Sequence, residues 1–392
     1  MLRFFKNVVL VALELIWFPL LAVAAVIARL WPKKRIIGLG PEPLINNVYH
    51  AKALQRHGWR AETFVDSLYF ITAEFDVKLI FRSSPLRTLS RLLFVPFLFC
   101  IFRYKVIYIY FNGGGLYASR LLWTVEPLLY RIAGIKVIVM PYGGDVQDMQ
   151  KCPNLAFRHA VDKDYPKHFR RRHTIRAKVW LWSRWADHVI SGCDWVDYMQ
   201  HWDTLCVSHF SIDLDYWVAS PTASREGRPM RILHAPNHKN IKGTRFFEQA
   251  IADLQREGVA VELVMVQGVP NSQLRTLMQS CDVIADQLII GWYAMFAIEA
   301  MALRKPVLCF TRTDLEDLYV QANLLERGEL PLIKCNPGNV VDVIRELTKT
   351  PTSRLSELGD RGRAYVERRH SLDTIGAMFS SIHAVLGIHR DA

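Results

Sequence analysis

One carboxylate, Glu299, lies within the otherwise apolar segment GWYAMFAIEAMALRKPVLCF, residues 291–310. The segment predicts a helix that begins after a Gly-Trp-Tyr turn, and the first turn of such a helix points free backbone N–H groups at whatever lies before it. A buried carboxylate needs hydrogen-bond donors, and a pair of sugar hydroxyls is one source of them. The alternative is that Glu299 caps a helix end or pairs locally, and this helix alone does not separate the two.

Glycine-rich turns follow predicted strands in the first half of the chain, where open parallel sheets bind ligands. GLGPEP at 38–43 is not a dinucleotide fingerprint because Pro43 stands where a third glycine is required. It indicates either a tight turn or a backbone that admits a substrate. Asp145 could reach substrate hydroxyls as a catalytic residue, although a carboxylate that only closes a turn would look the same. The candidate loop residues are Gly38, Gly40, Asn112, Gly113, Gly114, Gly143, Gly144 and Asp145.

Strands and helices alternate along the chain, which predicts two doubly wound α/β domains with parallel sheets. The predicted strands are 35–40, 105–111, 135–146, 187–193, 204–213, 230–236, 261–268, 282–287, 306–310 and 330–335. The predicted helices are 44–58, 119–134, 244–257, 271–280, 294–303, 338–349, 353–369 and 371–387. Two such domains facing one another leave a cleft lined by the carboxyl ends of their strands. A composition break at ASPTASREGRP predicts a linker, and the expected parts are therefore 1–34, 35–218, 219–229, 230–370 and 371–392.

The N-terminus carries a nearly uninterrupted apolar run of 21 residues, 8–28, between basic residues on both sides. At about 1.5 Å per residue such a helix reaches roughly 31 Å, about one hydrocarbon thickness. The basic cluster after the run places the remaining chain in the cytoplasm, on the face of the inner membrane. Glu14 and Pro19 weaken a spanning helix, since a carboxylate in the bilayer centre is costly. The alternative is a kinked or half-inserted anchor.

The formal net charge of +12 favours anionic partners, such as nucleotide diphosphates or lipid head groups. No nucleic-acid-binding motif is present, so nucleic acid is not an expected partner. Seven scattered cysteines without CxxC spacing predict reduced thiols and no metal site. Residues 91–105 suit either an interfacial helix or a core helix, and the basic stretch 163–178 either a lipid contact or a solvated loop.

The second half resembles the GT-B glycosyltransferases, in particular the retaining, nucleotide-sugar-dependent group called family four. That group carries a Glu-x7-Glu segment, and Glu299, followed by AMA and PV, matches its second glutamate. Gly291 stands where the first glutamate is expected, which is a clear departure. Ala294 and Arg304 replace glycines that are usual in the family.

Four further segments carry the resemblance. Lys242 and Gly243 match the family's Lys-Gly pair, while Asn237 stands where a basic residue is usual. YGGDV at 142–146 resembles an H-G-S-D-V turn, CDVIADQ at 281–287 the strand before the site, and the last helix one that crosses back to the first domain. The resemblance assigns donor binding to Asn237, His238, Lys242, Gly243, Gln287, Gly291, Tyr293, Ala294, Met295 and Glu299.

The resemblance implies the chemistry of this site. The charge of Lys242 and the N–H groups at the start of the helix would stabilise the leaving diphosphate, and Glu299 would hold ribose hydroxyls. No metal or other cofactor is then expected, because Asp213-Leu214-Asp215 has the letters of a metal motif but lies at a strand-to-turn crossing. The implied function is a membrane-associated transferase that moves a sugar, with retention, from a nucleotide-sugar donor to a lipid-linked or glycan acceptor in polysaccharide or glycolipid synthesis. Because Gly291 replaces a glutamate, a non-catalytic subunit that binds a nucleotide sugar or positions another transferase is the alternative.

Overall fold

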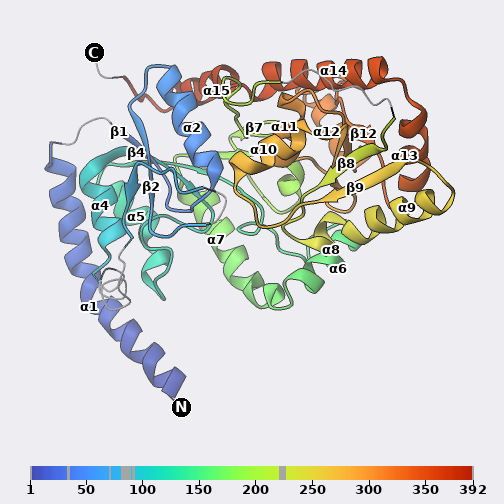
Figure 1. Cartoon of the computed structure of the whole chain (residues 1–392). Coiled ribbons are helices and arrows are strands. Elements are labelled where there is room, and N and C mark those ends of the chain that lie inside the picture. Colours follow the sequence, from blue (N-terminus) through green and yellow to red (C-terminus); the bar gives the residue numbers. More distant parts are fainter. Residues whose placement is uncertain are drawn as a thin grey trace.

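The computed structural model describes residues 2–32, 36–69, 72–80, 90, 93–219 and 227–390. Two α/β domains lie side by side, and helix α1 (Leu2–Leu30) runs along the outside of the first (Figure 1). Most of the predicted linker 219–229 falls outside the described residues, as do the ends of the predicted anchor 1–34 and residues 91 and 92 of the second apolar segment.

The first domain is built on a seven-stranded parallel sheet in the order β3-β2-β1-β4-β5-β6-β7. The strand order reverses between β1 and β4, and ligands of open parallel sheets bind beyond the carboxyl ends of strands at such a point. The strands are β1 (Ile36–Leu39), β2 (Ala61–Val65), β3 (Val77–Lys78), β4 (Tyr104–Tyr110), β5 (Lys136–Met140), β6 (His188–Ser191) and β7 (Thr204–Leu205).

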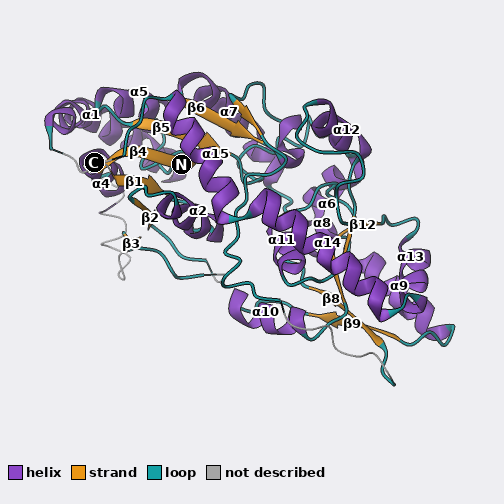
Figure 2. Ribbon diagram, turned by 90° about the horizontal axis from the view of Figure 1, so that it is seen from above, coloured by secondary structure: helices purple, strands orange, loops and turns teal. Residues whose placement is uncertain are grey.

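Helices cover both faces of this sheet (Figure 2). They are α2 (Ile45–Arg56), α4 (Val95–Arg103), α5 (Glu126–Ile132), α6 (Leu155–Asp164) and α7 (Arg172–Trp185), with short 3-10 turns η1 (Leu122–Thr124), η2 (His168–Arg171) and η3 (Cys193–Asp197). Helix α4 is a core helix, because it contacts both β4 and α1 and fully buries Phe97, Cys100 and Ile101. An interfacial helix at 91–105 is therefore wrong. The basic stretch 163–178 is not a loop, since it ends α6, forms η2 and begins α7.

The second domain has a five-stranded parallel sheet in the order β12-β11-β10-β8-β9. Its strands are β8 (Met230–His234), β9 (Val261–Met265), β10 (Val283–Gln287), β11 (Val307–Cys309) and β12 (Ile333–Lys334). Its helices are α8 (Lys239–Lys242), α9 (Thr244–Arg256), α10 (Asn271–Gln279), α11 (Met295–Ala302), α12 (Thr313–Gln321), α13 (Val340–Lys349) and α14 (Thr352–His370). Both predicted doubly wound domains are thus confirmed.

The last helix, α15 (Leu372–Val385), leaves the second domain and packs against α2 of the first. In Figure 1 α14 and α15 lie along one edge of the molecule, across both domains. The ring of Phe379 is fully buried there, and the Tyr108 hydroxyl lies 2.7 Å from Nε2 of His383. This crossing fixes the orientation of the two domains from one side.

Polar contacts fix the domains from the other side, where loops after the strands of both sheets meet. The Tyr319 hydroxyl donates to the Cys193 carbonyl oxygen at 2.6 Å, and Nδ2 of Asn154 donates to the Ile289 carbonyl oxygen at 2.7 Å. Because each bond joins one domain to the other, the carboxyl ends of the two sheets are held facing each other.

Helix α1 has two different faces. Its inner face packs on α4 and α5 and fully buries Leu21, Ala25 and Ala28. The carboxylate of Glu14 lies on this inner face and accepts hydrogen bonds from the backbone N–H groups of Arg120, Leu121 and Leu122, at 2.7, 2.6 and 3.2 Å. Glu14 therefore caps η1, which meets its need for donors without water.

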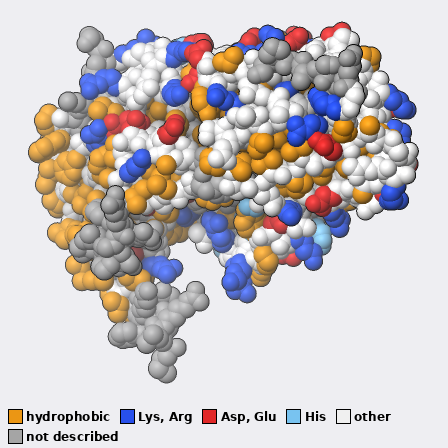
Figure 3. All heavy atoms as spheres, in the orientation of Figure 1, with side chains coloured by type: hydrophobic (Ala, Val, Ile, Leu, Met, Phe, Trp, Pro, Cys, Tyr) orange, Lys and Arg blue, Asp and Glu red, His pale blue; other side chains and the backbone are white. Residues whose placement is uncertain are grey.

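The outer face of α1 is apolar and exposed. Figure 3 shows hydrophobic side chains gathered over the side of the molecule that α1 covers. Residues Val8–Leu30 form a helix long and apolar enough to cross a membrane by length and composition, with 17% of the most apolar window buried. The exposed apolar residues of this helix are Val8, Val9, Leu13, Leu15, Ile16, Phe18, Leu20, Val23, Val26, Ile27 and Leu30.

Candidate active site

A cavity of about 240 Å³ lies in the second domain, between the loops that follow β8 and β9 and the first turns of α10 and α11. Ile45, the first residue of α2, also lines it, so the cavity borders the first domain. It brings together five of the residues predicted to bind a donor, although they lie far apart in the sequence: Asn237, Lys242, Ala294, Met295 and Glu299.

Glu299 is the buried carboxylate of this cavity, with 4% of its surface exposed. It lies one turn into α11, whose neighbouring residues are buried and apolar, and Nδ2 of Asn271 donates to its Oε1 at 2.7 Å. Burial raises the pKa of Glu299 to about 8, while the bond from Asn271 acts in the opposite direction. The second carboxylate oxygen makes no hydrogen bond with the described residues. Donors from a ligand in the cavity would stabilise the charged form.

Lys242 is the cationic side chain among the residues that line the cavity. Its Nζ lies 2.6 Å from Oδ1 of Asp286, a carboxylate at the end of β10 that is almost fully buried. Gly243 follows at φ +73°, where a side chain would meet Leu288 and Ile289 at 3.1 Å. Glycine therefore permits the turn between α8 and α9, which leaves Lys242 directed at the cavity.

Gln287 and Tyr293 do not line the cavity, and their side chains are used within the scaffold. Nε2 of Gln287 donates to the Phe310 carbonyl oxygen at 2.7 Å, and its Oε1 accepts from two backbone N–H groups of the following loop at 2.8 and 2.7 Å. The Tyr293 hydroxyl lies 2.7 Å from that of Tyr365 and 3.0 Å from Nε2 of His370. We therefore assign both residues to the support of the site.

Gly291 and His238 lie in contacts between the domains. A side chain at Gly291, where φ is +100°, would come within 2.7 Å of the Arg312 side chain, which forms an ion pair with Asp197 of the first domain. A glutamate at 291 is thus incompatible with this placement of Arg312. The ring of His238 lies 4.8 Å from that of Tyr165, whose hydroxyl is 2.5 Å from Nε2. Neither residue reaches the cavity.

A polar cluster lies beyond the carboxyl ends of β1, β4 and β5, and we call Glu42, Asn112, Tyr142 and Lys178 the Glu42 cluster. Nδ2 of Asn112 donates to Oε1 of Glu42 at 2.6 Å and lies 2.8 Å from the Tyr142 hydroxyl. Nζ of Lys178 donates to the Asn112 carbonyl oxygen at 2.7 Å. Burial raises the pKa of Glu42 above its ordinary value, and the bond from Asn112 opposes this.

Glu42 was not among the residues predicted from GLGPEP, which was interpreted as a tight turn or as a backbone that admits a substrate. It precedes Ile45 of the donor-side cavity by three positions in the chain, at the point where the strand order reverses. The signal for Glu42 in the sequence was a carboxylate between two prolines immediately after the first strand. Glu42 is only partly buried, unlike the enclosed Asp145, and the segment it begins leads to Ile45 of the donor-side cavity.

Asp145 is fully enclosed. Its Oδ1 accepts from the N–H groups of Tyr142 and Gly143 at 3.0 and 2.9 Å, and its Oδ2 accepts from Phe111 at 3.0 Å. Burial raises its pKa to about 7, against the effect of these three bonds. The carboxylate ties the end of β4 to the end of β5, so these contacts favour the structural alternative over a catalytic role.

The glycines predicted to line a loop site mostly serve close packing. Side chains at Gly38, Gly40 and Gly114 would come within 2.6 Å of Tyr104, Phe64 and Tyr130, respectively. Gly113, at φ +106°, faces Glu126, and Gly143, at φ +123°, donates to Asp145. No atom lies within 4 Å of the position that a side chain would take at Gly144. Of these predicted glycines, Gly144 alone borders open space.

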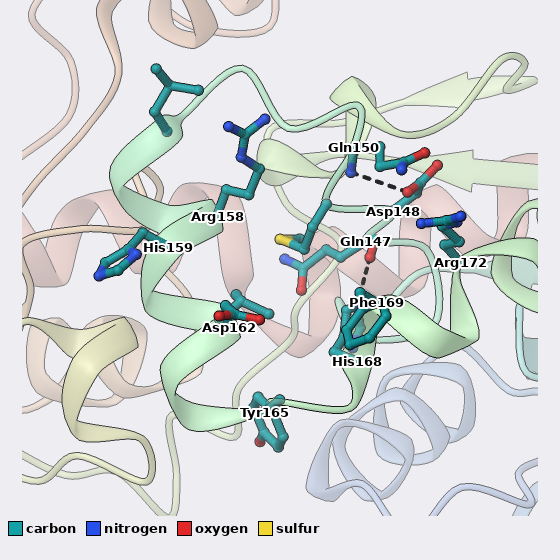
Figure 4. A pocket seen from close by; sticks show the side chains of 13 residues that line it. Gln147, Asp148, Gln150, Arg158, His159, Asp162, Tyr165, His168, Phe169 and Arg172 are labelled. Atoms are coloured by element: carbon teal, nitrogen blue, oxygen red, sulfur yellow. Dashed lines mark hydrogen bonds between the residues drawn. The ribbon is translucent and has the colours of Figure 1, made fainter.

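A larger cavity of about 410 Å³ lies in the first domain between residues 147–150, α6, η2 and the start of α7. Figure 4 shows Arg172 and Asp162 extending toward its centre, with His168 bonded to the Gln147 carbonyl oxygen at 2.7 Å. Its lining mixes cationic, acidic and apolar side chains. None of the residues predicted to bind the donor lines this larger cavity, so the larger cavity is separate from the donor-side cavity.

The arrangement of the two sheets is shared with solved structures. A structure of HepE from Anabaena in complex with UDP-glucose matches with a TM-score of 0.60 at 15% identity, over 90% of this chain and 99% of that one. The HepE complex with UDP matches at 0.59 and 14%, covering 90% and 100%. Sucrose-phosphate synthase from Thermosynechococcus elongatus matches at 0.55 and 12%, covering 90% and 99%.

The chain has the GT-B fold. This confirms the predicted architecture, and a coverage of 90% of this chain means that the likeness includes both domains. No family model and no curated protein matches the sequence. The similarity to GT-B proteins is therefore a similarity of fold.

The raised pKa of Glu299 makes a testable prediction about stability. The folded protein keeps the proton of the Glu299 carboxyl up to about pH 8, whereas the ordinary pKa of a glutamate is 4.5. The free energy of unfolding therefore falls as the pH rises from 4.5 to 8. Glu299→Gln keeps an acceptor for Asn271 and has no charge to bury. We expect its midpoint of urea unfolding, followed by circular dichroism, to match the wild type near pH 4.5 and exceed it above pH 8. Equal midpoints at both pH values would contradict the raised pKa.

Proposed function

We propose that this protein is a glycosyltransferase that moves a sugar from a nucleoside-diphosphate donor to a lipid-linked or glycan acceptor at a membrane. The observation that carries the proposal is the cavity in which Lys242 and Glu299 meet the first turn of α11, facing the first domain. The HepE complexes with UDP and UDP-glucose support it, because they show the same fold binding a donor of this class.

In the proposed reaction, the ribose hydroxyls of the donor donate hydrogen bonds to Glu299, which gives up its proton when the donor binds. The diphosphate accepts from Nζ of Lys242, and the N–H groups at the start of α11 face the same phosphates. Negative charge develops on the diphosphate as its bond to the sugar breaks, and the charge of Lys242 stabilises this leaving group. Asp286 holds the ammonium group at the cavity until then.

We assign the acceptor hydroxyl to Glu42. One acceptor hydroxyl donates to this carboxylate, which Asn112 holds in place, and the oxygen of a neighbouring acceptor hydroxyl attacks the anomeric carbon on the face that the diphosphate leaves. The proton of the attacking hydroxyl passes to the departing phosphate oxygen, so the sugar is transferred with retention. The product is a glycoside of the acceptor together with the nucleoside diphosphate.

Replacing Glu42 tests this assignment. Glu42→Gln loses a charge-assisted hydrogen bond worth about 1.5–3 kcal/mol, so we expect transfer to fall roughly ten- to a hundredfold. Donor affinity should stay unchanged, because Glu42 does not line the donor-side cavity. The matched control is Glu74→Gln, an exposed glutamate of the same domain. A loss of donor affinity in Glu42→Gln, or full transfer, would remove Glu42 from the reaction.

The proposal places α1 flat in the membrane interface with its outer face in lipid. Its inner face is in the protein core, and Glu14 is bonded to the backbone of η1, so a perpendicular helix surrounded by lipid does not fit these contacts. The basic residues that follow the helix favour the cytoplasmic face of the inner membrane. An acceptor carried by a bilayer lipid, as in polysaccharide or glycolipid synthesis, would meet the enzyme there.

The rival function is a non-catalytic subunit that binds a nucleotide sugar or positions another transferase. It is favoured by Gly291, whose place beside Arg312 excludes the family's first glutamate. Incubation of the purified protein with membranes and a panel of labelled nucleotide sugars separates the two. We expect label from one donor to enter the lipid fraction. Donor binding without transfer to any membrane preparation would favour the subunit.

A further inference from the structure

We infer that a cavity between α1 and the loop after β4 holds an apolar chain of the acceptor lipid and leads its head group to the Glu42 cluster. This inference rests on the proposed function, which leaves the position of the acceptor's lipid part open. The cavity has a volume of about 290 Å³ and lies in the first domain, away from the donor-side cavity.

One end of the cavity is apolar and continuous with the outer face of α1. Its walls there are Leu10, Leu13 and Trp17 of α1, with Phe94 and Pro96 at the start of α4. Leu13 is 38% exposed and belongs to both the cavity and the outer face of α1. The rings of Trp17 and Phe94 meet edge to face at 6.0 Å and close the inner wall. A chain lying in the membrane beside α1 can therefore enter without crossing a polar surface.

The carboxylate of Glu14, which lies in this apolar wall, does not make the binding of a hydrocarbon chain unfavourable. Glu14 also lines the cavity, yet its two oxygens accept three backbone hydrogen bonds from η1. Its hydrogen-bonding capacity is thus met by the protein itself, and an apolar neighbour removes no bond to water that the carboxylate depends on.

The other end of the cavity is polar and is joined to the Glu42 cluster by a hydrogen bond from Lys178 to Tyr117. The Tyr117 hydroxyl donates to Oδ2 of Asp66 at 2.9 Å, and both residues line the cavity. Lys178, a member of the cluster, donates to the carbonyl oxygens of Tyr117 and Asn112 at 3.4 and 2.7 Å. The charge of Asp66 contributes to the raised pKa of Glu42. A lipid whose chain fills the apolar end therefore has its head group beside Glu42.

The occupant that fits both ends is an amphiphile with one slender chain and a polar head. Arg120 also lines the cavity, and its exposed side chain adds positive charge at the cavity surface, which suits a phosphate on the head group. A water-soluble glycan would leave the apolar end empty, and a fully apolar molecule would bury Asp66 and Arg120 against hydrocarbon.

Photo-crosslinking tests this inference without relying on transfer. The probe is dodecyl phosphate with a diazirine near the end of its chain, added to the full-length protein in phosphatidylcholine vesicles, with adducts mapped by mass spectrometry. We expect adducts on the apolar walls of the cavity, at Leu10, Leu13, Trp17 and Phe94. Filling the cavity with Ala118→Trp should lower their yield at least tenfold. The matched control, Ile16→Trp, adds the same ring to the outer face of α1, where Ile16 is 64% exposed.

Adducts confined to the outer face of α1, or equal yields in the wild type and both variants, would overturn the inference. Leu13→Trp is a second filling variant, and circular dichroism identifies any variant that fails to fold. Donor binding distinguishes this inference from the proposed function, because the donor-side cavity lies in the other domain. Specific adducts in a protein that binds no nucleotide sugar would reject the proposed function, and donor binding without specific adducts would reject the lipid cavity alone.

Discussion

Removing the charge of Lys242 is expected to weaken donor binding and transfer ten- to a hundredfold, because the proposed charge-assisted hydrogen bond to the diphosphate, worth about 1.5–3 kcal/mol, would be lost. Lys242→Ala also leaves Asp286 as an unpaired buried carboxylate, which destabilises the fold by about 3–5 kcal/mol. The informative variant is therefore the double one, Lys242→Ala with Asp286→Asn. Compared with Lys242→Ala, we expect the double variant to have a melting temperature close to that of the wild type and an equally weak donor affinity.

Two controls make this result specific. Asp286→Asn alone keeps the ammonium group and should bind the donor more tightly than the double variant by the same ten- to hundredfold. Lys239→Ala removes an exposed lysine from the same short helix and should change neither quantity. Calorimetry gives the affinities and circular dichroism the melting temperatures. If the double variant binds as tightly as Asp286→Asn, the diphosphate lies elsewhere.

If the outer face of α1 lies in lipid, as proposed, we expect charges on this face to release the protein from membranes. Ile16, Leu20 and Val23 are 64%, 54% and 58% exposed on this face. Each apolar side chain contributes about 1.5–3 kcal/mol when buried in hydrocarbon, so replacing all three weakens partitioning by more than about a thousandfold. We expect Ile16→Glu, Leu20→Lys and Val23→Glu together to leave the protein in the supernatant after vesicle sedimentation. Leu155→Glu with Val385→Lys, two exposed apolar sites on other helices, should not.

Deleting residues 1–34 is not an equivalent experiment. Leu21, Ala25 and Ala28 are part of the first domain's core, and Glu14 caps η1, so the deletion exposes the faces of α4 and α5 that α1 covers. We expect aggregation of the shortened chain. A folded triple variant that still sediments with vesicles at both low and high salt would contradict the assignment of the outer face to lipid.

The fold was predictable because its central strands are buried runs of apolar residues that end in glycine-rich turns. This held for β1, β4 and β5, while β8 and β11 of the second domain are buried apolar strands without a glycine-rich turn after them. It failed for β2, where Ala61–Val65 includes Glu62 and Thr63 and carries no comparable apolar run. The helix predicted over 119–134 is broken, because η1 ends at Thr124 and a new helix, α5, begins at Glu126 with Pro127 in its first turn.

The site was predictable where a residue's role depends on local order along the chain, as with Lys242 before Gly243 or Glu299 within α11. The rest depends on partners that lie far away in the sequence. Asn271 lies 28 positions before Glu299, and Asp286 lies 44 positions after Lys242. Distant partners also decide the roles of Asp145 and Gly291. The Asp145 carboxylate accepts hydrogen bonds from backbone N–H groups at the ends of two strands, and the Arg312 side chain fills the space beside Gly291.

Donor affinity as a function of pH tests the central claim most directly, with Glu299 and its raised pKa as the reporter. Calorimetry would first select the tightest-binding donor from a panel of nucleoside-diphosphate sugars. We predict that the donor affinity of the wild type falls about tenfold for each pH unit below 8, because binding requires loss of the Glu299 proton. Glu299→Gln should bind the donor more weakly than the wild type at pH 8, and its affinity should not depend on pH in this range. Wild-type affinity that is independent of pH and equal to that of Glu299→Gln would show that the donor does not use this carboxylate, and would contradict the account.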